Sequence, residues 1–470
     1  DVEQLKEELR LRGGITVRTN FDPLRRIWKN RPAIPQSPVE IQPLEFAGEE
    51  TKSKLVRIRQ ALRHQHADGM LVTALDDIAW TLNLRGSDVH CNPVFVSYLL
   101  IASDKVTLFI NNVKVTDSVR SYLQGQGVEI ADYMDVAKGL RDYFEYNILL
   151  DPKEVCYTLS QQVTRQVVRG VSPIPVMKAV KNEREQAGFR SAMLRDGIAM
   201  VKFLKWIDEH IQTGQLTEMS VSDKLESLRQ EQPLYKGLSF DTIAGYETHG
   251  AIVHYEASPE TDAVLQPKGL LLLDSGAQYL DGTTDITRTI ALGSLTEEQR
   301  RVYTLVLKGH VQLQMLCFPA GASGTQLDAI ARKDLWRAGY NYLHGTGHGV
   351  GSYLNVHEGP HQIRMEWRPA PLHAGMTVTD EPGVYLEGRF GVRIENTLLI
   401  VPDNETECGR FLKFEPLTIC PIDKRPIILE MLTGEERAWL NQYHANCYAC
   451  LSSFLNEAEQ EWLRQMTLPI

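Results

Sequence analysis

Acidic side chains stand at the ends of apolar, strand-like segments in the second half of the chain. Asp274 directly follows Leu270-Leu-Leu-Leu273, and Asp285 lies beyond a turn at Asp281-Gly282. Taken alone, an Asp at the end of an apolar strand, as at Asp274, is equally typical of a turn cap and of a ligand. The alternation over residues 283–290 predicts a returning hairpin strand, on which Asp285 faces Asp274. Because like charges that face each other are destabilising unless a cation separates them, the pair favours a metal site.

Two more acids and a histidine fit the same chemistry. Glu381 and Glu395 lie in or beside further short apolar strands, and His348 stands between two glycines, where the backbone can approach closely. One imidazole and four carboxylates form an oxygen-rich set, which suits two divalent ions about 3.5–4 Å apart; ligand hardness favours Mn²⁺ over Zn²⁺. On residue type and spacing alone, a structural role for each of these residues stays open.

Several familiar catalytic and binding motifs are incomplete or absent. His357-Glu-Gly-Pro-His361 matches the zinc-protease pattern H-E-x-x-H, but Gly359 and Pro360 break the helix that this pattern needs. The run from Gly345 to Gly351 has Val350 where a dinucleotide-binding loop has glycine. The sequence contains neither a G-K-S/T phosphate loop nor a G-x-S-x-G nucleophile elbow. A zincin, a nucleotide-binding enzyme and a serine hydrolase of that type are therefore unsupported.

The candidate residues need a scaffold, and the pattern predicts one built from both helices and strands. Residues 46–175 are typical of an α/β domain. Its expected helices and strands are at 55–64, 69–73, 78–84, 94–102, 106–110, 136–144 and 148–151. A proline-containing break at 172–175 predicts a boundary with a second domain, residues 176–470, which opens with a long helix from Lys178 past Trp206. Residues 1–45 are expected to be a lead-in segment.

The second domain is expected to mix the two element types, so that the whole chain is of the α/β or α+β class. Its further expected elements are a helix at 221–231, strands over 240–292, helices at 296–316 and 326–338, and short strands over 344–402. Residues 423–470 predict a C-terminal helical extension, because Thr433-Gly-Glu-Glu436 has the capping-box pattern. One apolar stripe on it serves either the intrachain core, which is the default, or a two-fold interface: Trp439, Tyr443, Leu451 and Phe454.

Composition excludes several classes of partner. The 470 residues suffice for two or three domains with large cores. The 60 acidic and 50 basic residues give a formal charge of −10, without the basic stripe that nucleic acid requires, and no apolar run is long enough for a membrane span. Seven thinly spread cysteines favour a reducing, cytoplasmic setting. The start at Asp1, without Met or a signal-like stretch, indicates a fragment of something longer.

Taken together, these segments resemble the metal-dependent pita-bread peptidases, and within them the Xaa-Pro aminopeptidase (aminopeptidase P) family in its long cytosolic form. The resemblance covers nearly the whole chain: Asn83–Asp88 is similar to the middle domain of that form, and Lys178–Asn182 to the opening of its catalytic domain. The most specific motifs lie at residues 274–289, 343–351, 355–360 and 379–385. The resemblance implies a creatinase-like α/β domain followed by a pita-bread catalytic domain, with most or all of a preceding N-terminal domain lacking.

The resemblance also implies a metal-ligand set. Its members are Asp274, Asp285, His348, Glu381 and Glu395, with Asp285 and Glu395 bridging two divalent ions. Asp274 would hold one ion with both oxygens, while His348 and Glu381 complete the other. Mn²⁺ is the expected metal, with Zn²⁺ and Co²⁺ as the alternatives.

Further residues match the substrate-binding part of the family's site. His254 and His357 match substrate-contacting histidines, and His344 lines the same pocket. These three histidines and Glu381 are expected to be catalytic, and Arg393 to hydrogen-bond a ligand carboxylate. The chain departs from many relatives at His249 and Phe240, which puts fine pocket shape in doubt rather than the chemistry.

The activity implied by the resemblance is hydrolysis of the first bond of peptides with proline in second position. Prolidase, which cuts dipeptides only, shares the ligand set and is the close alternative. A non-catalytic pita-bread scaffold is the distant one, because such chains need not keep all five ligands. The resemblance further implies a homodimer through the catalytic and C-terminal region.

Overall fold

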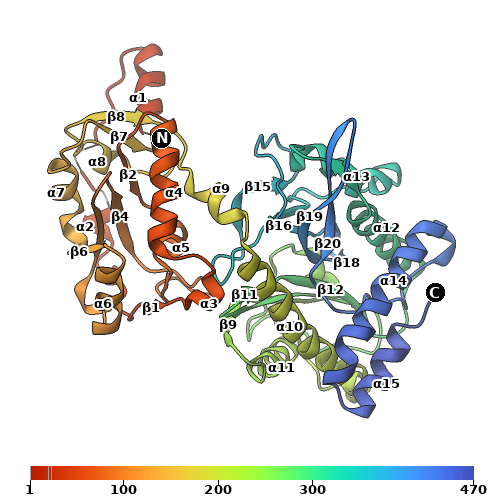
Figure 1. Cartoon of the computed structure of the whole chain (residues 1–470). Helices are drawn as coiled ribbons and strands as arrows, with labels where there is room; N and C mark the ends of the chain where they lie inside the picture. Colours follow the sequence, from red (N-terminus) through yellow and green to blue (C-terminus); the bar gives the residue numbers. More distant parts are fainter. Residues whose placement is uncertain (1, 20, 23) are drawn as a thin grey trace. The chain divides into compact units, whose positions relative to one another are not determined.

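The computed structural model describes residues 2–19, 21–22 and 24–470. The chain divides into two compact units, Asp1–Leu44 with Glu49–Met177 and Glu45–Gly48 with Lys178–Ile470. The points of division lie within α3 (Leu44–Ala47), directly after Gly48 and within α9 (Ile174–Ala179) (Figure 1). The domain limits predicted at residues 45 and 175 stay predictions, because the compactness of the two units does not show that each part folds as a separate domain.

The first unit is built on a mixed six-stranded sheet with the strand order β6-β5-β4-β2-β7-β8. These strands are β2 (Gly69–Val72), β4 (Ser97–Ile101), β5 (Val106–Ile110), β6 (Glu129–Ala131), β7 (Asn147–Leu150) and β8 (Gln166–Arg169). The short strands β1 (Glu40–Ile41) and β3 (Leu84–Arg85) pair separately. Apolar side chains from β4, β5 and β7 pack with those of α7 and α8 in one core, as an α/β domain requires.

The helices of the first unit are α1 (Val2–Leu11), α2 (Leu24–Ile27), α4 (Thr51–His64), α5 (Leu75–Leu82), α6 (Asp117–Gly125), α7 (Val136–Arg141) and α8 (Tyr157–Ser160). Of these, the sequence predicted α4, α5 and α7, and the structure has them with shifted ends. The prediction was wrong at the end of α5, because Asn83 adopts a left-handed conformation that ends the helix, and Leu84 begins β3.

The second unit contains two four-stranded sheets and two hairpins. In one sheet β10 (Leu270–Tyr279) pairs with β9 (Tyr235–Tyr246), β11 (Gly282–Thr283) and β12 (Ile286–Ala291). The other has the order β13-β20-β19-β16, with β13 (Cys317–Pro319), β16 (Thr377–Asp380), β19 (Asn396–Thr406) and β20 (Gly409–Pro416). The hairpins are β14 (Gly347–Gly349) with β15 (Glu358–Ile363), and β17 (Gly383–Leu386) with β18 (Phe390–Arg393).

The helices of the second unit are α10 (Glu183–His210), α11 (Glu218–Gln230), α12 (Glu297–Gln314), α13 (Gly324–Arg337), α14 (Gly434–Leu451) and α15 (Glu457–Met466) (Figure 1). The prediction that the long helix opens at Lys178 was wrong. Lys178 lies in α9, and α10 begins after Asn182, whose side chain accepts hydrogen bonds from the Arg184 and Glu185 amides in a capping box. An Asn in this position ends one segment and starts the next, because it satisfies amides that lack helical partners.

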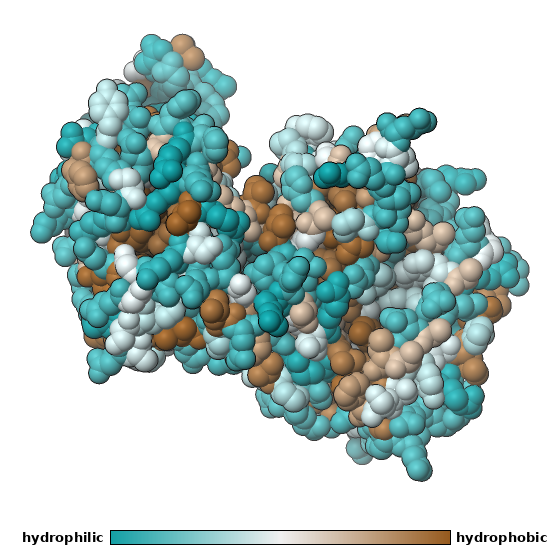
Figure 2. Space-filling model, viewed as in Figure 1, coloured by the Kyte–Doolittle hydropathy of each residue, from teal (hydrophilic) through white to brown (hydrophobic). Residues whose placement is uncertain are grey.

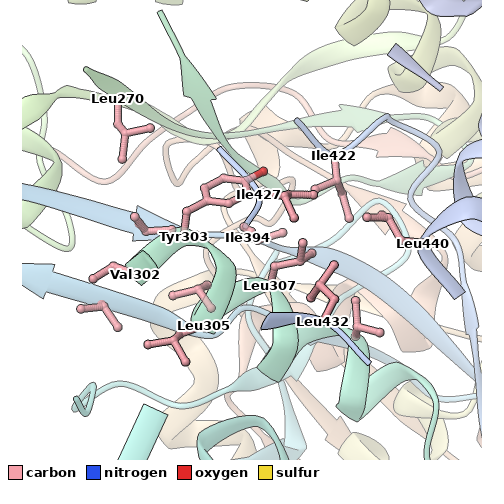
Figure 3. Close-up of a cluster of buried hydrophobic side chains, with 14 of the residues drawn as sticks. Leu270, Val302, Tyr303, Leu305, Leu307, Ile394, Ile422, Ile427, Leu432 and Leu440 are labelled. Carbon is pink, nitrogen blue, oxygen red and sulfur yellow. The ribbon is translucent and has the colours of Figure 1, made fainter. Parts of the chain in front are cut away.

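A large apolar cluster fixes the backbone of one candidate ligand. Tyr303 and Leu307 of α12 pack with Ile394 and with residues of the C-terminal segment, including Leu440 (Figure 3). Val392 and Ile394 are fully buried in this cluster. Because side chains alternate along an extended chain, Arg393 and Glu395 point away from it.

The C-terminal helices are mostly intrachain core. The capping box at Thr433 and Glu436 is present, as predicted. Tyr443 and Leu451 are buried, whereas Phe454 lies beyond α14 and is 56% exposed. The prediction that Phe454 continues the apolar stripe of Trp439, Tyr443 and Leu451 was therefore wrong. Over the face that Figure 2 presents, polar side chains dominate and hydrophobic ones are scattered. Among the described residues, no helix combines the length and apolar character that a bilayer crossing needs.

Candidate metal centre

One cavity of about 460 Å³ in the second unit collects the candidate residues. It is lined by all nine side chains singled out in the sequence: His254, Asp274, Asp285, His344, His348, His357, Glu381, Arg393 and Glu395. The acids, His348 and Arg393 come from β10, β14, β18 and the segments that flank β12, β16 and β19, whereas His254, His344 and His357 come from the segments that follow Ala251, precede β14 and precede β15. Residues up to 141 positions apart therefore meet at one place; the role of each stays a prediction.

The β10–β12 hairpin positions the first two acids. Leu271 and Leu273 of β10 pack in a core cluster with α10 and α11, so Asp274 lies on the opposite face of the strand. The register pairs Asp274 with Thr287, and Asp285 precedes β12. The prediction that the two acids face each other directly was wrong: the hairpin turns at Leu280–Asp281, so Asp285 lies two residues from the position opposite Asp274, and the two acids are diagonal neighbours.

Three ligand candidates lie in mutual contact range. One ligand atom from each of Asp285, His348 and Glu395 lies within 4.8 Å of the other two, and all three residues are buried. The Nε2 atom of His348 is 3.4 Å from Asp285 Oδ2 and 3.6 Å from Glu381 Oε1. Its Nδ1 is 2.9 Å from the Gly349 carbonyl, a partner to which only an N–H can donate. In the neutral ring Nε2 then carries the lone pair, which faces the carboxylate oxygens as in a metal-ligating histidine.

Asp274 is held from one side only. Arg393 Nη2 donates to Asp274 Oδ2 at 2.6 Å, and both groups are largely buried. The other oxygen, Asp274 Oδ1, is buried without a hydrogen-bond partner. A buried carboxylate oxygen without a donor is costly, so its environment fits a cation ligand.

The remaining carboxylates repel one another in their ionised forms. Burial raises the pKa of Asp285 well above its usual value, and the charges of Asp274 and Glu381 raise it further. Burial, followed by the charges of Asp285 and Glu381, likewise raises the pKa of Glu395 well above its usual value. The pKa of Glu381 is raised mainly by burial. One arginine beside four clustered acids leaves an excess of negative charge that bound cations would neutralise.

Two of the pocket histidines are neutral at physiological pH. The charge of His348 and burial lower the pKa of His357 to about 4, and the rings of the two histidines lie 4.2 Å apart. Burial lowers the pKa of His344 to about 4. His254 is exposed at the cavity wall. The imidazoles of His344 and His357 can therefore serve as neutral hydrogen-bonding groups.

Sequence reasoning missed the side chains that support the ligands. Thr287 Oγ1 donates to Glu395 Oε2 at 2.8 Å and accepts from Arg393 Nε at 3.2 Å. The Tyr385 hydroxyl accepts from Arg393 Nη1 at 2.7 Å and lies 2.9 Å from His344 Nε2. Both residues fall within quoted motifs, and the strict alternation of β12 is the signal that places Thr287 on the same face as Asp285.

The segment that matches H-E-x-x-H is not a helix. Residues Glu358–Ile363 form strand β15, and His361 Nε2 lies 2.7 Å from the Thr377 carbonyl. His357 lines the cavity, whereas His361 faces a main-chain carbonyl, so the two histidines of the pattern lie in different environments. This agrees with the exclusion of a zincin.

The residues present thus fit divalent cations, and comparison with known proteins gives the class. The model of metallopeptidase family M24 matches residues 187–402. Models of the creatinase/prolidase N-terminal domain and of the C-terminal region of peptidase M24 match residues 30–185 and 410–470. The chain belongs to metallopeptidase family M24, which confirms the predicted creatinase-like and pita-bread fold class.

Individual relatives are similar over nearly the whole chain. Aminopeptidase P1 of Arabidopsis thaliana is 40% identical, over 97% of this chain and 79% of its own length. Xaa-Pro aminopeptidase 1 of Dictyostelium discoideum is 41% identical, over 96% of this chain and 74% of its own length. These matches confirm the resemblance on which the sequence predictions rested.

Solved structures agree with this assignment. The X-prolyl aminopeptidase of Caenorhabditis elegans, a cytosolic enzyme with a di-nuclear active site, superposes with a TM-score of 0.95 at 35% identity, over 100% of this chain and 79% of that one. The prolidase of Pyrococcus horikoshii OT3 superposes with a TM-score of 0.63 at 26% identity, over 79% of this chain and 99% of that one.

Proposed function

We propose that this chain is a metal-dependent aminopeptidase that hydrolyses the bond between the first residue and a following proline. The observation behind the proposal is that five metal-ligand candidates and three histidines line one cavity in a member of family M24. The names of the relatives, aminopeptidase P and Xaa-Pro aminopeptidase, supply the preference for proline.

The five ligand candidates would hold two divalent ions. By the family resemblance Asp285 and Glu395 would bridge, with Asp274 on one ion and His348 and Glu381 on the other. The mutual approach of Asp285, His348 and Glu395 within 4.8 Å supports this arrangement. The di-nuclear site of the C. elegans relative supports two ions, and the hard oxygen ligands favour Mn²⁺ over Zn²⁺ or Co²⁺. When bound, such ions activate water and polarise the scissile carbonyl.

The chain's own residues would orient the peptide and move the proton. Glu381, whose pKa burial raises, is suited to accept a proton from the attacking water and deliver it to the departing proline nitrogen. His357, neutral at pH 7, and His254 would orient the carbonyl and support the developing oxyanion. Arg393 would keep Asp274 in place, and Tyr385 would keep His344 in place.

Removal of a bridging ligand tests the site. Asp285→Ala or Glu395→Ala should abolish both metal binding and turnover, whereas wild-type protein should lose activity on chelation and regain it with Mn²⁺. An alanine variant that still binds two ions and cleaves Xaa-Pro-Yaa peptides at the wild-type rate would contradict the assignment.

Prolidase activity is the close alternative, since prolidases are also similar in structure. The match of residues 410–470 to the C-terminal region and the whole-chain similarity to aminopeptidases favour the longer substrate. Rates on Gly-Pro and on a longer Xaa-Pro-Yaa peptide separate the two, and a preference for the dipeptide would overturn the choice. A scaffold without catalysis is the distant alternative, and a folded protein that binds no metal would revive it.

We also propose a cytoplasmic homodimer. The cytosolic C. elegans relative and the seven free cysteines support the location. The C-terminal helices are the proposed interface region, with Phe454 the most exposed of their predicted apolar stripe. Sedimentation at micromolar concentration should show twice the mass of the chain, and a clean monomer would refute the dimer.

A further inference from the structure

The segment that positions His254 has little regular structure of its own. After β9 the chain forms the 3₁₀ turn Glu247–Ala251 and then runs to Ala263 without a helix or strand. His254 lies in the middle of this segment, exposed at the cavity wall. Its position must therefore come from contacts that the segment makes with neighbouring elements.

On the cavity side, β18 provides these contacts. Gly391 of β18 lies so close to Gly250 that a Cβ atom on Gly391 would come within 1.7 Å of the Gly250 carbonyl oxygen. Arg393 Nη2 lies 3.4 Å from the Val253 carbonyl oxygen. One side of the segment is thus fixed to the strand that also bears Arg393.

On the other side, the segment forms hydrogen bonds with one fully buried carboxylate, that of Glu218. Glu218 Oε1 accepts from the Tyr246 amide at 2.7 Å, and Oε2 accepts from the Ala263 amide at 3.0 Å and from the Tyr255 hydroxyl at 2.9 Å. His249 Nδ1 lies 2.9 Å from both oxygens, and its ring stacks on Tyr255 at 4.4 Å. Glu218 is 0% exposed.

These four partners bracket His254 in sequence, beginning at Tyr246, the last residue of β9. Two precede it, and Tyr255 and Ala263 follow it. The Glu218 amide donates to the Ala263 carbonyl at 3.1 Å, so the same residue ties the far end of the segment twice. Glu218 is the first residue of α11, where the helix dipole favours a negative charge.

We propose that Glu218 is a positioning residue for the reaction, which holds the 246–263 segment so that His254 faces the bound peptide. The inference rests on the proposed function, in which His254 orients the scissile carbonyl. Glu218 itself does not line the cavity, whereas the segment that it holds does, through His254 and its neighbours Val253, Tyr255 and Glu256. Of these, His254 is the group through which Glu218 would act on the reaction.

Glu218→Gln is the informative change because it keeps the shape of the side chain. Both carboxylate oxygens accept hydrogen bonds from the segment, so the amide nitrogen of glutamine must face donors at one of the two places. The segment then shifts, and a displacement of about 1 Å can cost about 100-fold in rate. We expect kcat/KM for an Xaa-Pro-Yaa peptide to fall about 10- to 100-fold, mainly through kcat, with two metal ions still bound.

A double-mutant cycle separates positioning from a general structural effect. In the His254→Ala background, Glu218→Gln should change kcat/KM by less than about twofold, because the residue through which it acts is gone. The same fold loss in both backgrounds would overturn the proposal. Asp223→Asn is the matched control, since it removes a carboxylate from the exposed side of the same helix and should leave the wild-type rate unchanged.

Amide hydrogen exchange provides a readout that does not depend on activity. Peptides covering 246–263 should exchange faster in Glu218→Gln than in the parent, while the rest of the chain is unchanged; unaltered exchange there would overturn the proposal. If the parent itself fails to cleave Xaa-Pro peptides, the proposed function falls, and exchange alone decides the role of Glu218.

Two milder variants keep the proposal testable if Glu218→Gln does not fold. Tyr255→Phe and His249→Ala each remove one partner of the carboxylate. Each should lower kcat/KM about 2- to 10-fold in the presence of His254 and much less in its absence, because each loses one hydrogen bond to a charged group. Wild-type kinetics in both variants would overturn the proposal.

Discussion

Thr287→Val should weaken metal binding without disturbing the fold. Thr287 is fully buried on β12, where its hydroxyl donates to Glu395 Oε2 at 2.8 Å and accepts from Arg393 Nε at 3.2 Å. Valine has nearly the same shape, so the change removes the hydroxyl and little else. Glu395 then loses the donor that fixes the direction of its oxygens.

The size of the effect follows from the charge on the partners. A hydrogen bond to an ionised group is worth about 1.5–3 kcal/mol, and loss of an outer-shell partner typically costs 10- to 100-fold in metal affinity. The two figures agree, since tenfold corresponds to about 1.4 kcal/mol. We therefore expect the dissociation constant of the more weakly held ion to rise 10- to 100-fold.

A chelator-competition titration with Mn²⁺ measures this change. Thr289→Val is the matched control: Thr289 lies two residues along the same strand, is equally buried, and donates to the Arg393 main-chain carbonyl rather than to a carboxylate. The control should lose about 1 kcal/mol of stability and keep its metal affinity within about threefold. Equal metal affinity in both variants would refute the idea that Thr287 acts through Glu395.

Three further outcomes are expected. In metal-free protein the raised pKa values of Asp285 and Glu395 make the folded state bind protons more tightly than the unfolded chain. The stability of the fold should therefore decrease as pH rises above the ordinary carboxyl pKa of about 4. Melting temperatures measured across this pH range test the expectation, and a melting temperature that increases with pH would contradict it. Leu307→Ala, in the buried cluster of α12, should cost about 2–5 kcal/mol in urea unfolding, and a loss below about 1 kcal/mol would count against tight packing there. Asn182→Ala should cost about 1 kcal/mol by removing the cap of α10, and an unchanged urea midpoint would show that the cap is dispensable.

The elements with strong local patterns could be predicted from the sequence. Leu270–Leu273 followed by a turn predicted the hairpin that became β10 and β12, and Thr433 with Glu436 predicted the start of α14. Segment ends were less predictable where one residue decides them. Asn182 separates α9 from α10 because its side chain caps α10. The spacing of apolar residues contains no information about such a hydrogen bond.

The candidate site was predictable as a set and not as a geometry. Residue types and motifs selected the four acids and one histidine that line the cavity, but the hairpin register depends on where the chain turns, so the diagonal relation of Asp274 and Asp285 could not be read from spacing. Glu218 lacked any motif: an acid at a helix start is ordinary, and Ala263, its most distant partner, lies 45 residues away. Only the folded chain shows that these groups meet.

Arg288 ties the site to the end of the chain. It lies on β12 beside Thr287, fully buried, and donates to the carbonyls of Glu395 and Cys420 and to the Tyr443 hydroxyl of α14. The main chain at the candidate ligand Glu395 is thereby linked through Arg288 to a helix near the C-terminus. During synthesis the pocket cannot reach its final packing until that helix has emerged, so a chain that ends before residue 443 would leave the Arg288 guanidinium without the hydroxyl that accepts its hydrogen bond, and we expect such a chain to bind divalent cations poorly.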